Sequence, residues 1–343
     1  MAIARLGSHE DARDSSCSSS PSLLEVDDLE VSIGGTQLLS EVSLTMRAGE
    51  LVGLVGESGS GKTLTGLSLL GLLPPTAAVT GRIWFEGVDL IAADQSRLRD
   101  VRGRAISMIF QEPRASLHPA RPLGKQITDV IHAHEQVPAA DARRRAVDML
   151  GMVGLPDPRR VMDSYIHELS GGMCQRAMIA MALVCGPRLL VADEPTTALD
   201  VTIQAQMIAL LRRLASELDL SVLLITHNLG VVVDLCSRIV TMYCGQVVND
   251  DSTSQLLDEP QHPYPSALLR ASDISFDSPD DWSGISGAPA SPARPPRGCR
   301  FHPRCPHAQE RCAENAPPLE PGRHGGRTRC LRSDELTLQG VSR

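Results

Sequence analysis

The sequence predicts an α/β fold in which helices cover both faces of a parallel sheet. Three nearly continuous apolar runs, at residues 51–56, 188–194 and 221–227, have the composition of strands that are buried on both faces. Helical segments separate these runs, and strands that alternate with helices form parallel sheets. Residues 112–169 are rich in Ala, Arg, His and Asp with helical periodicity, so we expect a helical insert between two parts of the sheet.

Two further strands and one helix are expected around the first apolar run. Residues 23–33 and 40–46 contain short alternating apolar runs, which are typical of strands. Residues 63–73 form an apolar helical stretch. We expect Pro74 and Pro75 to end this helix, because proline lacks the N–H group that a helix needs.

Composition divides the chain into three parts. Residues 1–21 are polar and rich in serine, which is typical of a disordered tail. Residues 22–250 carry the strand and helix patterns and should form the main domain. Residues 251–343 form a C-terminal extension, with a linker-like stretch rich in Pro, Ser and Gly at 275–298 and a Cys-rich segment at 299–330.

The overall composition disfavours several classes of protein. The chain has 343 residues, of which 42% are hydrophobic and 22% charged, as in globular proteins of two or three domains. Its net charge of −8 disfavours a nucleic-acid partner. We expect no secretory signal, because the first residues contain no apolar h-region, and no membrane span, because no stretch of about 18 apolar residues lacks charge or proline. Nine cysteines without such a signal indicate a reducing compartment.

A glycine-rich motif, GESGSGKT, occupies residues 56–63 between the first apolar run and the helix. It matches the pattern G-x-x-x-x-G-K-[ST] at every fixed position and lies in the required strand-to-helix context. Such glycines let successive N–H groups point at phosphate oxygens, while the lysine adds positive charge and the threonine can ligate Mg²⁺. A chance glycine-rich turn is the alternative. The candidate phosphate-binding residues are Gly56, Ser58, Gly59, Gly61, Lys62 and Thr63.

Two acidic residues, Asp193 and Glu194, end the apolar run LLVADE. A carboxylate at the end of a buried strand beside a phosphate-binding loop is well placed to hold Mg²⁺, and we assign this role to Asp193. Glu194 would accept a proton from an attacking water as a general base. Without other motifs, two acidic residues after an apolar run would more often mark only a solvated strand end. The glycine-rich motif GESGSGKT favours the functional interpretation here.

The motif LSGGMCQR begins a further helical stretch at residue 169. Ser170, Gly171 and Gly172 lie at the expected start of the helix, where unpaired N–H groups can bind an anion. The alternative is a serine that only caps the helix.

In order and spacing, these motifs resemble the ATPase subunit of ABC transporters over residues 22–270. The resemblance rests on GESGSGKT, IFQEP with Gln111, LSGGM, LLVADEPTTALD and ITH with His227. The pieces IFQEPRASLHP, HELSGG, DEPTTALDVT and PQHPYPSALL resemble the oligopeptide/dipeptide subfamily in particular. The resemblance implies a P-loop NTPase core with a parallel sheet, an antiparallel β subdomain and a helical insert.

The resemblance also implies how the site works. Two ATPase subunits would pack head to tail, with each ATP between the phosphate loop of one and Ser170, Gly171 and Gly172 of the other. Gln111 would contact Mg²⁺ or the attacking water, His227 would bind the γ-phosphate, and Asp200 would communicate across the dimer. For His227 the alternative is a capping or packing histidine. The helical insert, starting with residues 113–122, would contact the membrane subunits.

Departures from the family pattern concern the nucleotide base and two neighbours of the motifs. Ile33 stands where such ATPases usually have an aromatic residue that stacks on adenine, so we expect apolar contact without stacking and weaker ATP binding. Cys174 and Asn228 replace a basic or polar residue and an aspartate, respectively. Neither changes the implied roles of Ser170 or His227, so we expect a competent site.

The C-terminal extension contains a group of four cysteines: Cys299, Cys305, Cys312 and Cys330. Their spacing matches neither a zinc ribbon nor a bacterial ferredoxin. The segment resembles the C-terminal extension of peptide-transporter ATPases, some of which hold a [4Fe–4S] cluster, and we expect such a cluster here. Zinc and free thiols are the alternatives. His302, His307 and His324 are reserve ligands.

Together these features predict an ATP- and Mg²⁺-dependent ATPase subunit of a peptide importer, peripheral on the cytoplasmic face of the cell membrane. The implied partners are a second ATPase subunit, two integral-membrane permeases and an extracytoplasmic substrate-binding protein, with no nucleic acid. Nickel or another small solute is an alternative cargo. A soluble ABC ATPase of DNA repair or translation is a less favoured alternative, as is an iron–sulfur regulator with a vestigial ATPase.

Overall fold

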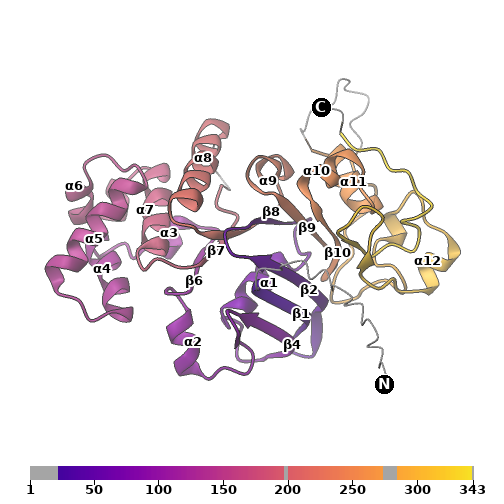
Figure 1. Cartoon of the computed structure of the whole chain (residues 1–343), viewed down its shortest axis with the longest axis horizontal. Coiled ribbons are helices and arrows are strands. Elements are labelled where there is room, and N and C mark those ends of the chain that lie inside the picture. The colour runs from indigo at the N-terminus through magenta and orange to yellow at the C-terminus, as the bar shows by residue number, and fades with distance from the viewer. Residues whose placement is uncertain (1–21, 197–199, 273–283, 342–343) are drawn as a thin grey trace, which may run out of the picture.

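The computed structural model describes residues 22–196, 200–272 and 284–341. Two sheets form the centre of the molecule, the helical insert lies at one end, and the C-terminal extension lies at the other (Figure 1). The smaller sheet is antiparallel, with the strand order β2-β1-β4-β5. Its strands are β1 (Ser22–Ile33), β2 (Thr36–Arg47), β4 (Ala77–Phe85) and β5 (Val88–Asp89).

The larger sheet has the strand order β11-β12-β10-β9-β3-β8-β7-β6. The five strands from β9 to β6 pair in parallel, whereas β10, β12 and β11 are added antiparallel at one side. The strands are β3 (Leu51–Val55), β6 (Ile106–Ile109), β7 (Leu189–Asp193), β8 (Ser221–Thr226), β9 (Arg238–Tyr243), β10 (Gln246–Ser252), β11 (Glu320–Pro321) and β12 (Arg327–Thr328). The predicted α/β class, parallel core and antiparallel subdomain are confirmed.

Helices cover both faces of the larger sheet. The α-helices of the described residues are α1 (Lys62–Leu69), α2 (Gln95–Val101), α3 (Pro113–Ser116), α4 (Leu123–His134), α5 (Ala139–Met152), α6 (Pro158–Asp163), α7 (Gly171–Leu183), α8 (Val201–Glu217), α9 (Leu229–Leu235), α10 (Thr253–Asp258), α11 (Pro263–Arg270) and α12 (Glu310–Glu314). Helices α3 to α6 lie within the residues expected to form the insert, and they gather with α7 away from the antiparallel sheet (Figure 1).

Alternating side chains of the parallel strands pack into two different cores. In β8, Val222 and Leu224 pack with α7, α8, α9 and the insert, whereas Leu223 and Ile225 pack with α1 and the antiparallel sheet. Successive side chains of a strand point to opposite faces, so an uninterrupted apolar run is needed to bury both. This requirement explains why these strands were visible in the sequence.

Helix α1 ends before the prolines that were expected to end it. Its last residue is Leu69, and Gly71 follows in the left-handed conformation with φ +58°. The Gly71 N–H donates to Ser68 O at 3.0 Å and the Leu72 N–H donates to Leu67 O at 3.0 Å. This pair of bonds is a Schellman cap, so glycine ends the helix, and the expectation for Pro74 and Pro75 was wrong.

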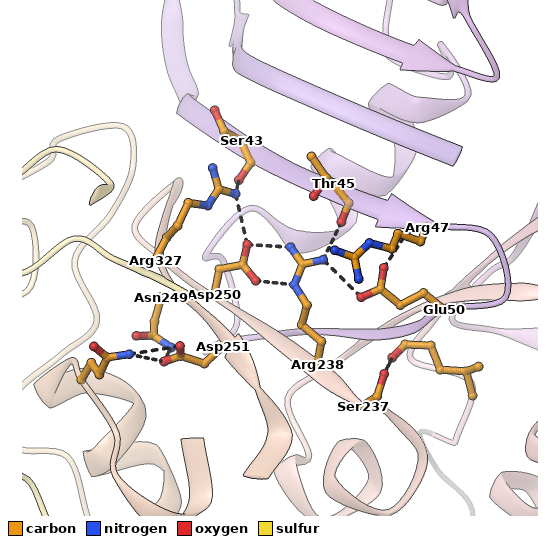
Figure 2. A network of polar contacts seen from close by, with 12 residues as sticks. Ser43, Thr45, Arg47, Glu50, Ser237, Arg238, Asn249, Asp250, Asp251 and Arg327 are labelled. Atoms are coloured by element: carbon orange, nitrogen blue, oxygen red, sulfur yellow. Dashed lines mark hydrogen bonds and ion pairs between the residues drawn. The ribbon is translucent and has the colours of Figure 1, made fainter. Parts of the chain in front are cut away.

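A buried ion network connects the two sheets and the extension (Figure 2). The Arg238 guanidinium of β9 makes two hydrogen bonds to Asp250 of β10, at 2.6 and 2.7 Å, and an ion pair with Glu50 at 3.2 Å. It also donates to the Thr45 carbonyl of β2 at 2.9 Å. Arg327 of β12 donates to Asp250 at 3.1 Å. These contacts fix the extension against the antiparallel sheet.

Candidate functional site

The glycine-rich loop between β3 and α1 has a backbone shape that only glycine allows. Gly56 has φ +152°, and a Cβ there would lie 2.2 Å from the Met242 carbonyl oxygen. Gly61 has φ +106°, and a Cβ there would lie 2.5 Å from Leu39 Cδ2. Both values exclude an ordinary side chain. The loop therefore curls tightly at the carboxyl end of a buried strand and leads directly into a helix N-terminus.

The Lys62 ammonium lies inside this loop. Its Nζ donates to the carbonyl oxygens of Gly56 at 2.8 Å and Glu57 at 3.1 Å. Burial lowers the pKa of Lys62, while the nearby carboxylates of Glu194 and Asp193 oppose this shift. A buried cation that donates to carbonyl oxygens keeps its full positive charge, so it is suited to receive an anionic ligand.

Asp193 lies beside the first residues of α1. It ends β7 and is only 2% exposed, and the Thr63 hydroxyl donates to its Oδ1 at 3.2 Å. Burial raises the pKa of Asp193, and the hydrogen bond from Thr63 opposes the shift. A buried carboxylate paired with a hydroxyl is the oxygen-ligand set that Mg²⁺ prefers beside a phosphate. The structure thus brings together Thr63 and Asp193.

Glu194 and His227 contact each other directly. The His227 ring Nδ1 lies 2.7 Å from Glu194 Oε1, and the His227 backbone N–H donates to the same oxygen at 3.2 Å. The Glu194 side chain is 12% exposed and that of His227 is 64% exposed. Glu194 also has φ +49°, an uncommon conformation for a residue with a side chain. The sequence motifs gave separate roles to these residues and did not reveal this pairing.

Lys62, Thr63, Glu194 and His227 line one cavity of about 840 Å³, whereas the buried Asp193 is not among its lining residues. Gln111 follows β6, Glu194 follows β7 and His227 follows β8, so neighbouring strands present all three at the same sheet edge. Ligands of parallel α/β sheets bind at this carboxyl edge. Apolar residues that the sequence analysis did not select line the rest of the cavity: Leu38, Leu268, Ala271, Ile285 and Pro292.

Several expected site residues lie elsewhere. Ile33 ends β1, where it pairs with Thr36 and Ala77, and it is not among the residues that line the cavity. Leu38 of β2 provides apolar contact there instead. Ile285 and Pro292 also line the cavity, although they come from the stretch that was expected to be a linker. Its composition, rich in Pro, Ser and Gly, did not indicate this role.

The residues implied to act across a dimer do not line this cavity. Ser170 is exposed at the start of α7, where its hydroxyl accepts the Met173 N–H at 3.3 Å. Asp200 is exposed at the start of α8 and accepts the Ile203 N–H at 2.9 Å. Both residues cap helices, as the alternative interpretation held for Ser170. Gly171 and Gly172 are the first two residues of α7.

The four cysteines of the extension line one small cavity, together with His302 and His307. No disulfide bond joins any two of them, and burial raises the pKa of Cys330 to about 12 and that of Cys305 to about 11. Among the described residues, no group of His, Cys, Asp or Glu is arranged to hold a metal ion. The expected iron–sulfur cluster is therefore not confirmed. His324 lies outside this cavity and pairs with Glu259 at 2.9 Å.

Comparison with known proteins gives a consistent match. Residues 39–197 match the family model "ABC transporter", and residues 250–312 match "Oligopeptide/dipeptide transporter, C-terminal region". The oligopeptide transport ATP-binding protein AppD of Bacillus subtilis is 45% identical over 86% of this chain and 90% of its own. The dipeptide transport ATP-binding protein DppD of Escherichia coli is 41% identical over 90% of this chain and 96% of its own.

Solved structures agree with the sequence relatives. The ATP-binding cassette MJ0796, in a dimeric post-hydrolysis state with ADP and Pi, matches 67% of this chain and 98% of its own with a TM-score of 0.60 and 26% identity. The cbiO1 protein of Clostridium perfringens matches 69% of this chain and 91% of its own, with a TM-score of 0.60 and 25% identity. None of the helices in the described residues has the length and apolar character of a membrane span.

Proposed function

Because this chain belongs to the family of ABC transporter ATP-binding subunits, we propose that the cavity over residues 56–63 is its site of ATP hydrolysis. The chain is the ATPase subunit of a peptide importer, as its oligopeptide and dipeptide transport relatives are. One observation carries the assignment of the site. The phosphate loop, Gln111, Glu194 and His227 line one cavity at neighbouring strand ends, and the buried Asp193 accepts a hydrogen bond from Thr63 of that loop.

In this proposal the amides of the loop and the Lys62 ammonium bind the β- and γ-phosphates of ATP. Thr63, Asp193 and Gln111 would hold Mg²⁺, which neutralises phosphate charge and orients the oxygens. Glu194 orients and deprotonates the attacking water, and this role is supported by its half-buried carboxylate at the rim of the cavity. His227 fixes that carboxylate through its ring nitrogen and presents its exposed edge to the γ-phosphate.

The experiment that tests this assignment replaces Glu194 with glutamine in the assembled transporter. Glu194→Gln keeps the shape of the side chain and removes its basicity, so ATP binding should persist while turnover falls by about 100-fold or more. Lys62→Ala should instead abolish binding of the nucleotide. If Glu194→Gln hydrolyses ATP as fast as the wild type, the assignment of the base is wrong.

We propose that the second half of each ATP site comes from another ATPase subunit. Ser170, Gly171 and Gly172 lie at an exposed helix start, where amides and a hydroxyl can bind the γ-phosphate side of a nucleotide held by the partner. The dimeric cassette among the structural matches supports this arrangement. ATP would then hold the two subunits together, and its hydrolysis would release them.

The remaining partners follow from the same family. The importer would include two permeases in the membrane and an extracytoplasmic substrate-binding protein, and this chain would bind peripherally to the cytoplasmic face of the permeases. The surface around residues 113–122, at the start of the helical insert, would make that contact. Co-purification with the permeases should be lost when this surface carries added charge, while nucleotide binding by the chain persists.

We also propose that Cys299, Cys305, Cys312 and Cys330 hold a [4Fe–4S] cluster. Their enclosure of one cavity supports this, and nine arginines against three acids between residues 294 and 332 would offset the charge of four thiolates. Bound there, a cluster would cross-link the extension. Protein purified without oxygen should contain iron and show visible absorbance, which Cys305→Ser should remove and Cys185→Ser should not. Zinc without iron, or neither metal, would contradict the proposal.

A further inference from the structure

The phosphate loop contains an acidic residue whose presence its function does not explain. Glu57 is the second residue of GESGSGKT and lines the cavity proposed to receive a triphosphate. A free carboxylate in that position would repel the phosphates and weaken their binding. We infer that Arg304 of the Cys-rich extension is a positioning residue for the phosphate loop, because it pairs with Glu57 and holds its negative charge away from ATP.

The pairing has the geometry of a strong ion pair. Two nitrogens of the Arg304 guanidinium donate to the two carboxylate oxygens of Glu57, at 2.6 and 3.0 Å. The Arg304 side chain is only 5% exposed and that of Glu57 is 24% exposed, so solvent screens the pair little. Parallel hydrogen bonds of this kind fix orientation as well as charge, and lysine cannot reproduce them.

A second contact from the extension side fixes the backbone at the same residue. The Glu57 N–H donates to the Tyr264 hydroxyl of α11 at 2.9 Å. Tyr264 packs against Tyr243 of β9 and Phe301 of the extension, with ring centroids 4.7 and 5.1 Å apart, in a small core that the sheet and the extension share. The first turn of the loop is therefore held by side chains about 200 to 250 positions further along the chain.

Arg304 also holds the wall of the cavity. Its guanidinium donates to the carbonyl oxygens of Ser286 at 2.9 Å and Ile285 at 3.3 Å. Ile285 lines the cavity, so one buried side chain connects the phosphate loop with an apolar residue of the cavity lining. Arg304 immediately precedes Cys305, one of the four gathered cysteines. The folded state of the Cys-rich extension is thereby coupled to the affinity of the loop for ATP.

The test measures ATP binding and turnover by variants of the full chain in the assembled transporter. Arg304→Met leaves the Glu57 carboxylate unpaired, and it should raise Kd and KM for ATP about tenfold, with a much smaller fall in kcat. The double variant Glu57→Gln/Arg304→Met should recover most of the lost affinity for ATP, because no carboxylate remains at residue 57 to repel the phosphates. The defect of Arg304→Met alone should shrink at high salt.

A matched control and a conservative variant separate this role from a general loss of folding. Arg311→Met removes another ion pair of the extension, the exposed pair with Glu335, and it should leave KM at the wild-type value. Arg304→Lys keeps the charge but loses the two parallel hydrogen bonds, so its KM for ATP should lie between those of the wild type and Arg304→Met. It also replaces Arg304→Met as the test variant if Arg304→Met does not fold.

The inference is overturned if Arg304→Met or Arg304→Lys binds ATP like the wild type. It is also overturned if the double variant binds as weakly as Arg304→Met. The inference rests on the proposed function, and the two fail in different ways. Wild-type chain that binds no ATP would contradict the proposed function itself, whereas normal binding that is insensitive to Arg304 would reject the positioning role alone.

Discussion

At the scale of single residues, the shape of the phosphate loop depends on glycines with positive φ. Gly61 precedes Lys62 with φ +106°, and the packing of Leu39 leaves no room for a Cβ. The position of the Lys62 ammonium therefore depends on the backbone conformation of the glycine that precedes it. Backbone strain of this kind persists only where the surrounding structure enforces it.

We predict that Gly61→Ala weakens ATP binding at least tenfold and lowers the free energy of unfolding by about 1–3 kcal/mol. The methyl group must displace Leu39 or the loop itself, and either change moves Lys62. Gly87→Ala is the matched control, since Gly87 has φ +78° and nothing within 4 Å of the added Cβ. It should cost similar backbone strain without any loss of nucleotide affinity, as measured by titration with a fluorescent ATP analogue.

At the scale of secondary-structure elements, the site is a consequence of strand order. Adjacent parallel strands end at one edge, so short segments far apart in the sequence deliver Gln111, Glu194 and His227 to one cavity. The sequence revealed β3, β7 and β8, because strands buried on both faces must be apolar throughout. It did not reveal β6, whose four residues are too short a run to separate from a buried helix segment.

Contacts between distant segments were not predictable from local patterns. Ile285 and Pro292, which line the cavity, lie in a stretch with the composition of a linker, and the position of these two residues depends on tertiary packing that composition does not report. The pair of Arg304 with Glu57 joins residues 247 positions apart, and no period or motif reports such a contact. Ser170 was recognisable as a helix start, but its exposure is a property of the tertiary structure.

Helix α11 provides a prediction about pH. His262 precedes the helix, is 1% exposed, and its Nδ1 accepts the Tyr264 N–H at 3.0 Å. Complete burial lowers the pKa of His262 to about 3, so the folded chain keeps the imidazole neutral while the unfolded chain binds a proton below about pH 6.5. The unfolded state then holds more protons, and stability is lost as the pH falls through this interval.

We therefore predict that His262→Asn reduces the acid sensitivity of the protein. Asparagine can still cap the helix but does not ionise. Between pH 7 and pH 5 the wild type should lose about 2 kcal/mol more unfolding free energy than the variant. Urea unfolding of both proteins at the two pH values measures this difference. Equal losses would show that His262 does not carry the effect.

At the scale of the whole molecule, the C-terminal extension is part of the cassette, and ion pairs are among the contacts that hold it there. The Arg238 network joins β12 to the sheets (Figure 2), and the Arg304 pair joins the Cys-rich segment to the phosphate loop. Ion pairs that are buried and hydrogen-bonded are costly to break from one side. Substitutions that unfold the extension or break these ion pairs should therefore weaken ATP binding.

The proposed mechanism requires two such molecules. In one chain the cavity lies at the strand ends and Ser170 lies at the start of α7. Ser170 is not among the residues that line the cavity of its own chain. Each ATP would bind between the cavity of one subunit and Ser170 of another, so that ATP turnover depends on association of the two subunits. The partner can be a second copy or a different ATPase subunit of the same importer.

The dependence of ATPase rate on subunit concentration tests this claim most directly, measured on the wild type and on Ser170→Arg in the presence of the partner subunit. Turnover per chain should rise steeply with concentration until the subunits are paired, and Ser170→Arg should lower it by at least tenfold at every concentration. Turnover per chain that is constant down to high dilution, and indifferent to the change at Ser170, would contradict the account.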